Sequence, residues 1–195
     1  MDWFANRLIK WHETHGRKNL PWQRDITPYR VWLSEIMLQQ TQVTTVIPYF
    51  ERFLNRFPDI EELSKSDLNE VLGLWSGLGY YARARNIHKT ARLIVSEFDS
   101  RFPHNLDLLM QLPGIGRSTA GAILSISMNI PSPILDGNVK RVLTRFHTIK
   151  GYPEKSEIKK KLWEVAESHT PNTQFQKYTQ AVSYTHLTLP TIAIV

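Results

Sequence analysis

The sequence contains no cysteine among its 195 residues, and this absence removes several kinds of site at once. Disulfide bonds are excluded, and so is any metal ion or iron–sulfur cluster that cysteine thiolates of this chain would hold. Long apolar runs are also missing, because no stretch reaches the roughly 18 residues that a membrane-spanning helix needs. The first 16 residues are amphipathic, contain acidic side chains and do not resemble a secretory signal peptide. We therefore expect a cytoplasmic protein without membrane contact.

Alternating patterns of apolar and polar residues, which indicate β-strands, are scarce, and no fixed-period repeat or low-complexity tract occurs. Apolar residues instead recur at helical spacing through most of the chain. Thr27 followed by Pro28 predicts a helix start, with threonine as N-cap, and this helix should run to about Gln40. Asp67 and Glu70 have the spacing of a capping box. The predicted fold class is all-α.

Basic residues outnumber acidic ones, with 24 lysines and arginines against 18 aspartates and glutamates, which gives a net charge of +6. A basic chain favours a polyanionic partner such as nucleic acid, although many basic proteins bind none. The hydrophobic content of 42% is sufficient for a core of ordinary size. Charge alone does not decide between these alternatives.

The segment LPGIG, residues 112–116, predicts a tight turn between two short helices. Gly114 and Gly116 allow positive φ and close approach of the backbone to another group. Because a helix starts where the turn ends, its N-terminal N–H groups suit a phosphate. A plain turn is the alternative, but the small-residue helix that follows favours a helix-hairpin-helix, which contacts the DNA backbone without reading sequence.

Asp136 precedes another predicted helix and is expected to be its N-cap. Local spacing favours capping as its only role. The alternative is that backbone N–H groups and the helix N-terminus hold the carboxylate ionised. A fixed anion of this kind could stabilise a cation in a transition state.

Glu35 lies inside the predicted helix that starts at Pro28. On a helical wheel with about 100° per residue, only Arg30 and Ser34 form a narrow polar strip, so the helix should be buried on most sides. A surface position at the edge of the apolar face is an equally good interpretation of Glu35. If the carboxyl group is buried, its pKa would rise and it would suit a general acid. An acid of this kind beside an ionised carboxylate such as Asp136 is the arrangement that cleaves glycosidic bonds.

Four motifs occur in a fixed order between residues 2 and 182. They are LPWQRDITPYRVWLSEIMLQQTQVTTVIPYFERF, LWSGLGYYARARNIH, LPGIGRSTAGAIL and LDGNVKRV. Together they resemble MutY-type adenine DNA glycosylases, which remove adenine paired with 8-oxoguanine or guanine in base excision repair. The resemblance implies a monomer that acts on double-stranded DNA in the bacterial cytoplasm, at the nucleoid.

The resemblance also implies a helix-hairpin-helix glycosylase fold for residues 1–182. A six-helix barrel lobe would take in about 25–133, and a second lobe about 1–24 and 134–182. The target adenine would be flipped into a pocket between the lobes, because base chemistry on a duplex requires extrusion.

Catalytic roles follow from the same resemblance. Glu35 matches the general acid that protonates adenine N7 and then acts on the attacking water. Asp136 matches the carboxylate that stabilises the sugar cation or bonds transiently to C1′. Asn138 matches a residue that supports this group.

DNA-contacting roles also follow from the resemblance. Gln40 and Tyr80 match residues that insert into the duplex, while Trp22 and Gln180 match positions that contact the flipped adenine. For Trp22 and Tyr80, core packing is the alternative, because aromatic residues near glycine turns usually pack.

The related endonuclease III type shares the fold but carries a lysine nucleophile two residues after the second hairpin glycine. Here that position is Ser118, beside Gly114 and Gly116, which match the phosphate-binding hairpin. The serine favours a monofunctional glycosylase over a lyase. A non-catalytic DNA-binding fragment is the remaining alternative.

The match ends near Val182, whereas the family continues with four cysteines that bind a 4Fe-4S cluster and with a domain that recognises 8-oxoguanine. Residues 183–195, SYTHLTLPTIAIV, are atypical of the family and contain no cysteine. Our hypothesis is a truncated gene or a sequencing or assembly artefact. We expect no cluster and no other metal on this chain.

Overall fold

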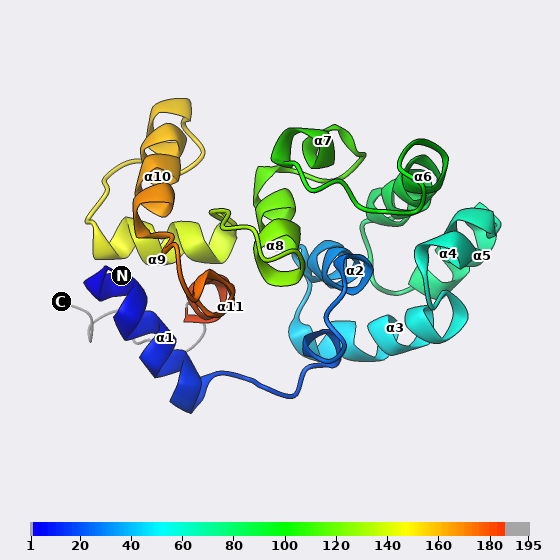
Figure 1. Cartoon of the computed structure of the whole chain (residues 1–195), viewed down its shortest axis with the longest axis horizontal. Helices are drawn as coiled ribbons and strands as arrows, with labels where there is room; N and C mark the ends of the chain where they lie inside the picture. Colours follow the sequence, from blue (N-terminus) through cyan, green and yellow to red (C-terminus); the bar gives the residue numbers. More distant parts are fainter. Residues whose placement is uncertain (1, 186–195) are drawn as a thin grey trace. The chain divides into compact units, whose positions relative to one another are not determined.

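The structure is a computed structural model that describes residues 2–185. Helices and connecting loops make up this part of the chain, and none of its residues forms a strand (Figure 1). The all-α prediction is therefore confirmed. The described residues form two compact units: one combines 2–18 with 124–185, and the central unit runs from Asn19 to Ile123.

The central unit is built around α6, which packs against α2, α4 and α5. Its elements are η1 (Pro21–Gln23), α2 (Pro28–Leu38), α3 (Val43–Arg56), α4 (Ile60–Lys65), α5 (Leu68–Trp75), α6 (Ala82–Glu97), α7 (Leu106–Gln111) and the first part of α8 (Arg117–Ser127). Large aromatic side chains fill the core of this unit, and the fully buried ones are Trp32, Phe50, Phe53, Phe57 and Trp75. Burial of so much aromatic surface is a main source of stability for the unit.

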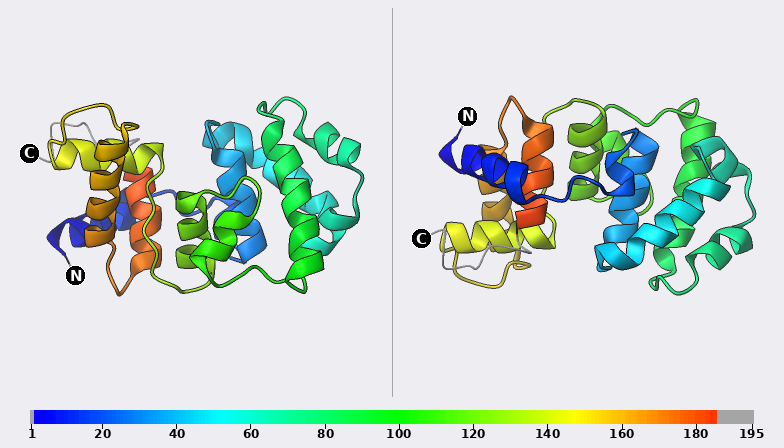
Figure 2. Two further views of the ribbon diagram at one scale, coloured as in Figure 1. Left: turned by 90° about the horizontal axis from the view of Figure 1, so that it is seen from above. Right: turned by 90° about the horizontal axis from the view of Figure 1, so that it is seen from below.

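The second unit combines the first helix of the chain with the last three. Its elements are α1 (Trp3–His15), α9 (Gly137–Phe146), α10 (Ser156–His169) and α11 (Phe175–Thr185). Helix α11 lies beside α1 and also contacts α9, which packs on α10 (Figure 2). The first helix and the last three helices therefore pack around one small apolar core.

The start of α2 is the one that the sequence predicts. The Thr27 hydroxyl accepts a hydrogen bond from the Arg30 N–H at 3.2 Å, and Pro28 occupies the first helical position. The helix ends at Leu38 rather than Gln40, because Gln40 adopts a φ of 56° that an α-helix does not allow.

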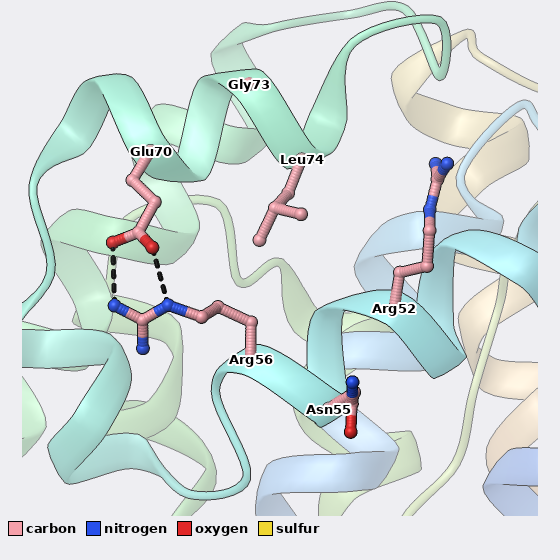
Figure 3. Close-up of a pocket in the computed structure, with 6 residues that line it drawn as sticks. All are labelled: Arg52, Asn55, Arg56, Glu70, Gly73 and Leu74. Atoms are coloured by element: carbon pink, nitrogen blue, oxygen red, sulfur yellow. Dashed lines mark hydrogen bonds and ion pairs between the residues drawn. The ribbon is translucent and has the colours of Figure 1, made fainter.

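The start of α5 agrees with the sequence only in part. Asp67 accepts a hydrogen bond from the Asn69 N–H at 2.7 Å and caps the helix. Glu70 does not complete a capping box, because its two carboxylate oxygens pair with Arg56 of α3 at 2.5 and 2.9 Å (Figure 3). A charged partner from another helix has replaced the local backbone contact.

Helix α11 continues to Thr185, three residues past the point at which the family match ends. The first three residues of the atypical tail, 183–185, are therefore helical. The rest of the tail, 186–195, lies outside the described residues. Within the described part of the chain, no helix has the length and apolar character needed to cross a membrane.

Candidate active site and DNA-binding elements

Helix α2 is buried on nearly all sides, as the wheel predicts, and Glu35 is half-buried within it. The buried residues of the helix are Tyr29, Val31, Trp32, Leu33, Ser34, Ile36 and Met37. The expected polar strip is wrong in one respect, because Ser34 is only 2% exposed. Its hydroxyl donates to the Val31 carbonyl at 2.9 Å, which satisfies a buried serine within its own helix. Glu35 is thus the only carboxylate on a mostly apolar helix.

Trp22 lies in η1 and is half-buried. Its ring meets Phe50 of α3 edge to face, with centroids 5.5 Å apart. This contact is the packing role that aromatic residues near turns usually have. The contact of Trp22 with a flipped adenine stays a prediction.

Asp136 is the N-cap of α9, which confirms the capping prediction. Its Oδ1 accepts hydrogen bonds from the backbone N–H groups of Asn138 and Val139 at 2.8 and 2.7 Å. Its Oδ2 accepts a third from the Ser183 hydroxyl at 2.8 Å. Capping thus occupies one oxygen, and the whole carboxylate is oriented by donors at a helix N-terminus, where a negative charge is favoured. Sequence reasoning missed Ser183, which lies beyond the last recognisable motif.

Gln180 is half-buried on α11, three residues before Ser183 and therefore on the same side of that helix. Since Ser183 bonds Asp136, the structure brings Gln180 to the neighbourhood of the α9 N-terminus. Asn138 is half-buried in the first turn of α9. The second unit therefore gathers three of the predicted site residues.

The two hairpin glycines differ. Gly114 adopts a φ of +80°, and a Cβ added there would lie 3.0 Å from the Asn86 Cβ. Gly116 is not at positive φ, and an added Cβ would meet no atom within 4 Å. Positive φ is therefore used at Gly114 only, whereas at Gly116 the exposed backbone is available for close approach to another group.

The hairpin is attached to α6 through a buried threonine. The Thr90 hydroxyl donates to the Pro113 carbonyl at 2.9 Å. Ile115, between the two glycines, is buried and anchors the tip of the turn. Ser118 is half-buried in the first turn of α8, at the position where the endonuclease III type carries lysine.

Gln40 and Tyr80 share an unusual backbone conformation. Both are exposed, and their φ angles are 56° and 51°, which non-glycine residues seldom adopt. Tyr80 is 60% exposed, so core packing does not account for it. Exposed side chains on strained backbone are a feature of functional loops.

Surface depressions occur in both units of the described chain. The first, of about 560 Å³, lies in the central unit, where Arg52, Asn55 and the Arg56–Glu70 ion pair line it together with α5 (Figure 3). It contains no predicted site residue. The second, of about 310 Å³, lies along α9 and is lined by basic side chains, among them Arg141 and Arg145. Basic side chains along α9 suit a polyanion.

Comparison with known proteins decides the family. The family described as "HhH-GPD superfamily base excision DNA repair protein" matches residues 33–168 of the chain. The chain belongs to this superfamily. The HhH-GPD chain is 52% identical over 179 residues to the adenine DNA glycosylase of Buchnera aphidicola subsp. Schizaphis graminum, a match that covers 92% of this chain and 52% of that protein. The adenine DNA glycosylase of Rattus norvegicus is 42% identical over 173 residues, which is 84% of this chain and 33% of the rat protein.

The HhH-GPD chain spans about half the length of the bacterial relatives it matches. Among solved structures, a thermostable thymine-DNA glycosylase superposes with a TM-score of 0.86 at 23% identity, over 95% of this chain and 85% of that one. A non-covalent endonuclease III–DNA complex gives a TM-score of 0.76 at 20% identity, over 93% and 82%. The helix-hairpin-helix glycosylase fold predicted from the sequence is thereby confirmed.

The 4Fe-4S cluster of the resembled family does not fit this HhH-GPD chain. Such clusters are held by thiolates, and the sequence contains no cysteine. The described residues also contain no group of three or more histidine, aspartate or glutamate side chains that could hold a metal ion. We therefore assign no part of the chemistry to a cluster.

Proposed function

We propose that this chain is the catalytic core of an adenine DNA glycosylase. It hydrolyses the N-glycosidic bond of adenine paired with 8-oxoguanine or guanine in double-stranded DNA, and it acts as a monomer in the bacterial cytoplasm. The observation that carries the proposal is the 52% identity over 179 residues to a protein named adenine DNA glycosylase. That alignment extends over 92% of the chain, far more than the hairpin motif alone.

Glu35 is the proposed general acid. It is a half-buried carboxyl group on a mostly apolar helix, a setting in which a carboxylic acid can serve as a general acid. The proton goes to N7 of adenine, so that the base leaves without a negative charge. The bond between the base and C1′ then breaks, and its electron pair goes to the departing adenine.

Asp136 is the proposed partner of the cationic sugar. Its carboxylate is fixed by three hydrogen-bond donors, so little reorganisation is needed when positive charge develops at C1′. Water adds to C1′ and gives up its proton to Glu35, which restores the acid. The products are free adenine and an abasic site.

The lyase alternative would need an amine that attacks C1′ and forms a Schiff base. The hairpin position at which the endonuclease III type carries its lysine holds Ser118, whose hydroxyl cannot form one. Borohydride should therefore trap no covalent complex between this chain and abasic DNA. Trapping at this site would support the lyase.

The acid assignment is tested with Glu35→Gln in a single-turnover assay on a duplex with one adenine opposite 8-oxoguanine. We expect duplex binding to be retained and adenine release to fall by about 100-fold or more, the usual contribution of a general acid. Glu51→Gln, at an exposed glutamate of α3, is the matched control and should keep the wild-type rate.

Comparable release by Glu35→Gln would refute the role of Glu35. A well-folded wild-type chain that binds duplex DNA without releasing adenine would instead identify a non-catalytic DNA-binding fragment. The two results are distinguishable because the wild type is measured first.

A further inference from the structure

Arg83 is a charged residue that the proposed chemistry does not use, yet it is only 8% exposed. It lies in the first turn of α6, and its two terminal nitrogens, which carry four N–H groups, lie within hydrogen-bond distance of six acceptors in the central unit, whereas the buried Nε has no partner. Burial of a charged side chain is costly unless its donors are satisfied. A cation buried with this many partners therefore needs a structural explanation.

The acceptors of Arg83 belong to two segments that are far apart in the sequence. The two N–H groups of Nη1 are shared among the carbonyl oxygens of Ile36, Met37 and Gln39, at N–O distances of 3.0, 2.9 and 2.6 Å. Those of Nη2 are shared among the Thr41 hydroxyl and the carbonyl oxygens of Leu78 and Gly79, at 3.1, 3.1 and 3.2 Å. The first segment is the C-terminal end of α2 and the residues directly after it, where the negative end of the helix dipole attracts a cation. The second is the glycine turn that precedes α6.

Each segment carries one of the residues predicted to insert into DNA. Gln40 lies between two of the acceptors, and Tyr80 directly follows another. Both have positive φ, a strained conformation that persists only where surrounding contacts enforce it. The Arg83 guanidinium also lies 5.3 Å from the centre of the Tyr80 ring, within the range of a cation–π contact.

We propose that Arg83 is a positioning residue that joins these two segments and presents Gln40 and Tyr80 to the duplex as a preorganised pair. The inference rests on the proposed function, because it assumes that the two side chains enter DNA. Ordering both segments before binding removes an entropic cost from the step that extrudes the base. Arginine is required because its planar fork reaches several carbonyls at once, whereas a lysine ammonium has three donors at one point.

The first test measures the backbone and does not depend on activity. Amide hydrogen exchange is followed in wild type, Arg83→Lys and the matched control Arg92→Lys, which alters an exposed arginine on the same helix. We expect exchange to accelerate at 39–42 and 78–80 together in Arg83→Lys alone, by about 10-fold or more. Acceleration in only one segment, or in neither, would overturn the proposal.

The second test is a functional cycle in the single-turnover assay. Arg83→Lys should lower adenine release by about 10- to 100-fold at saturating enzyme, the size expected for misplaced groups. In the background of Gln40→Ala with Tyr80→Ala, the same change should have less than about 3-fold further effect, because the residues act as one unit. Fully additive losses would contradict the positioning role.

Thr41→Val is a milder variant in case Arg83→Lys does not fold, because it removes a single acceptor of the guanidinium. It should produce the same pattern in the exchange and kinetic measurements with smaller amplitude, and an unchanged pattern counts against Arg83. If the wild type itself releases no adenine, the proposed function fails, and the exchange experiment alone decides whether Arg83 joins the segments.

Discussion

At the scale of single residues, the two candidate catalytic carboxylates differ in what surrounds them. Glu35 is half-buried on a helix whose other side chains are mostly apolar, and Asp136 faces three hydrogen-bond donors. Glu35 thus lies in partly apolar surroundings, whereas the Asp136 carboxylate is oriented by its donors. The cap at Asp136 was predictable because it depends on neighbours two and three residues away. The bond from Ser183 was not, because it depends on the packing of α11 against α9.

The hairpin glycines allow a prediction at the same scale. Gly114→Ala should lower the free energy of unfolding by about 1–3 kcal/mol, because alanine is strained at positive φ and its methyl group would press on Asn86. Gly116→Ala should leave the free energy of unfolding within about 0.5 kcal/mol of wild type, because its methyl group enters open space. Urea unfolding of both variants measures the difference.

Gly116→Ala should affect duplex binding, although we expect it to leave the free energy of unfolding nearly unchanged. The methyl group of Gly116→Ala would stand on exposed backbone where we propose that a phosphate approaches, so binding should weaken without loss of stability. Unchanged binding by this variant would remove Gly116 from the phosphate site.

At the scale of elements, helix starts were more predictable than helix surroundings. The N-caps at Thr27, Asp67 and Asp136 are all present, because capping is a local interaction. The ion pair of Glu70 and the burial of Ser34 were not predicted, since both depend on helices that the sequence pattern does not place. Arg83 was missed for the same reason.

The link between α6 and the hairpin gives a prediction for elements. Thr90→Val removes the hydroxyl that bonds the Pro113 carbonyl but keeps the shape of the side chain. We expect a loss of about 1–3 kcal/mol in the free energy of unfolding, because a buried acceptor loses its donor. Duplex binding should weaken too, since the hairpin is no longer fixed on α6.

Thr90→Ser is the matched comparison, because it keeps the hydroxyl and removes one methyl group. Its loss of stability should be about 1 kcal/mol, from the smaller apolar area buried, and duplex binding should remain close to wild type. Equal weakening of DNA binding in both variants would show that packing, and not the hydrogen bond, holds the hairpin.

At the scale of the whole molecule, the origin of each site prediction explains its limits. The hairpin and the cap at Asp136 follow from local physical chemistry, and their geometry agrees with it. The roles of Trp22, Gln40 and Gln180 came only from resemblance, because an isolated tryptophan or glutamine carries no chemical signature. Catalysis by Glu35 likewise stays a prediction, for half-burial makes an acid plausible without defining a substrate.

Net charge leads to a prediction for the whole chain. The chain has a net charge of +6, a hairpin predicted to bind phosphate and basic side chains along α9. Its binding to duplex DNA should therefore be driven largely by counterion release. The logarithm of the binding constant should then fall linearly with the logarithm of salt concentration, with a slope of about −3 or steeper for three or more neutralised phosphates. Fluorescence anisotropy of a labelled duplex across a salt series gives this slope.

The chemical step should respond differently to salt. Under the proposed function, adenine release at saturating enzyme should depend on Glu35 and Asp136 within the bound complex, where mobile ions screen buried groups much less. The single-turnover rate should therefore stay nearly constant over the salt range in which binding collapses. A binding slope near zero would argue against phosphate contacts by this chain. A single-turnover rate that falls in parallel with affinity would instead show that salt acts on the catalytic groups themselves. We do not expect this result, because Glu35 is half-buried and the Asp136 carboxylate is held by backbone N–H groups.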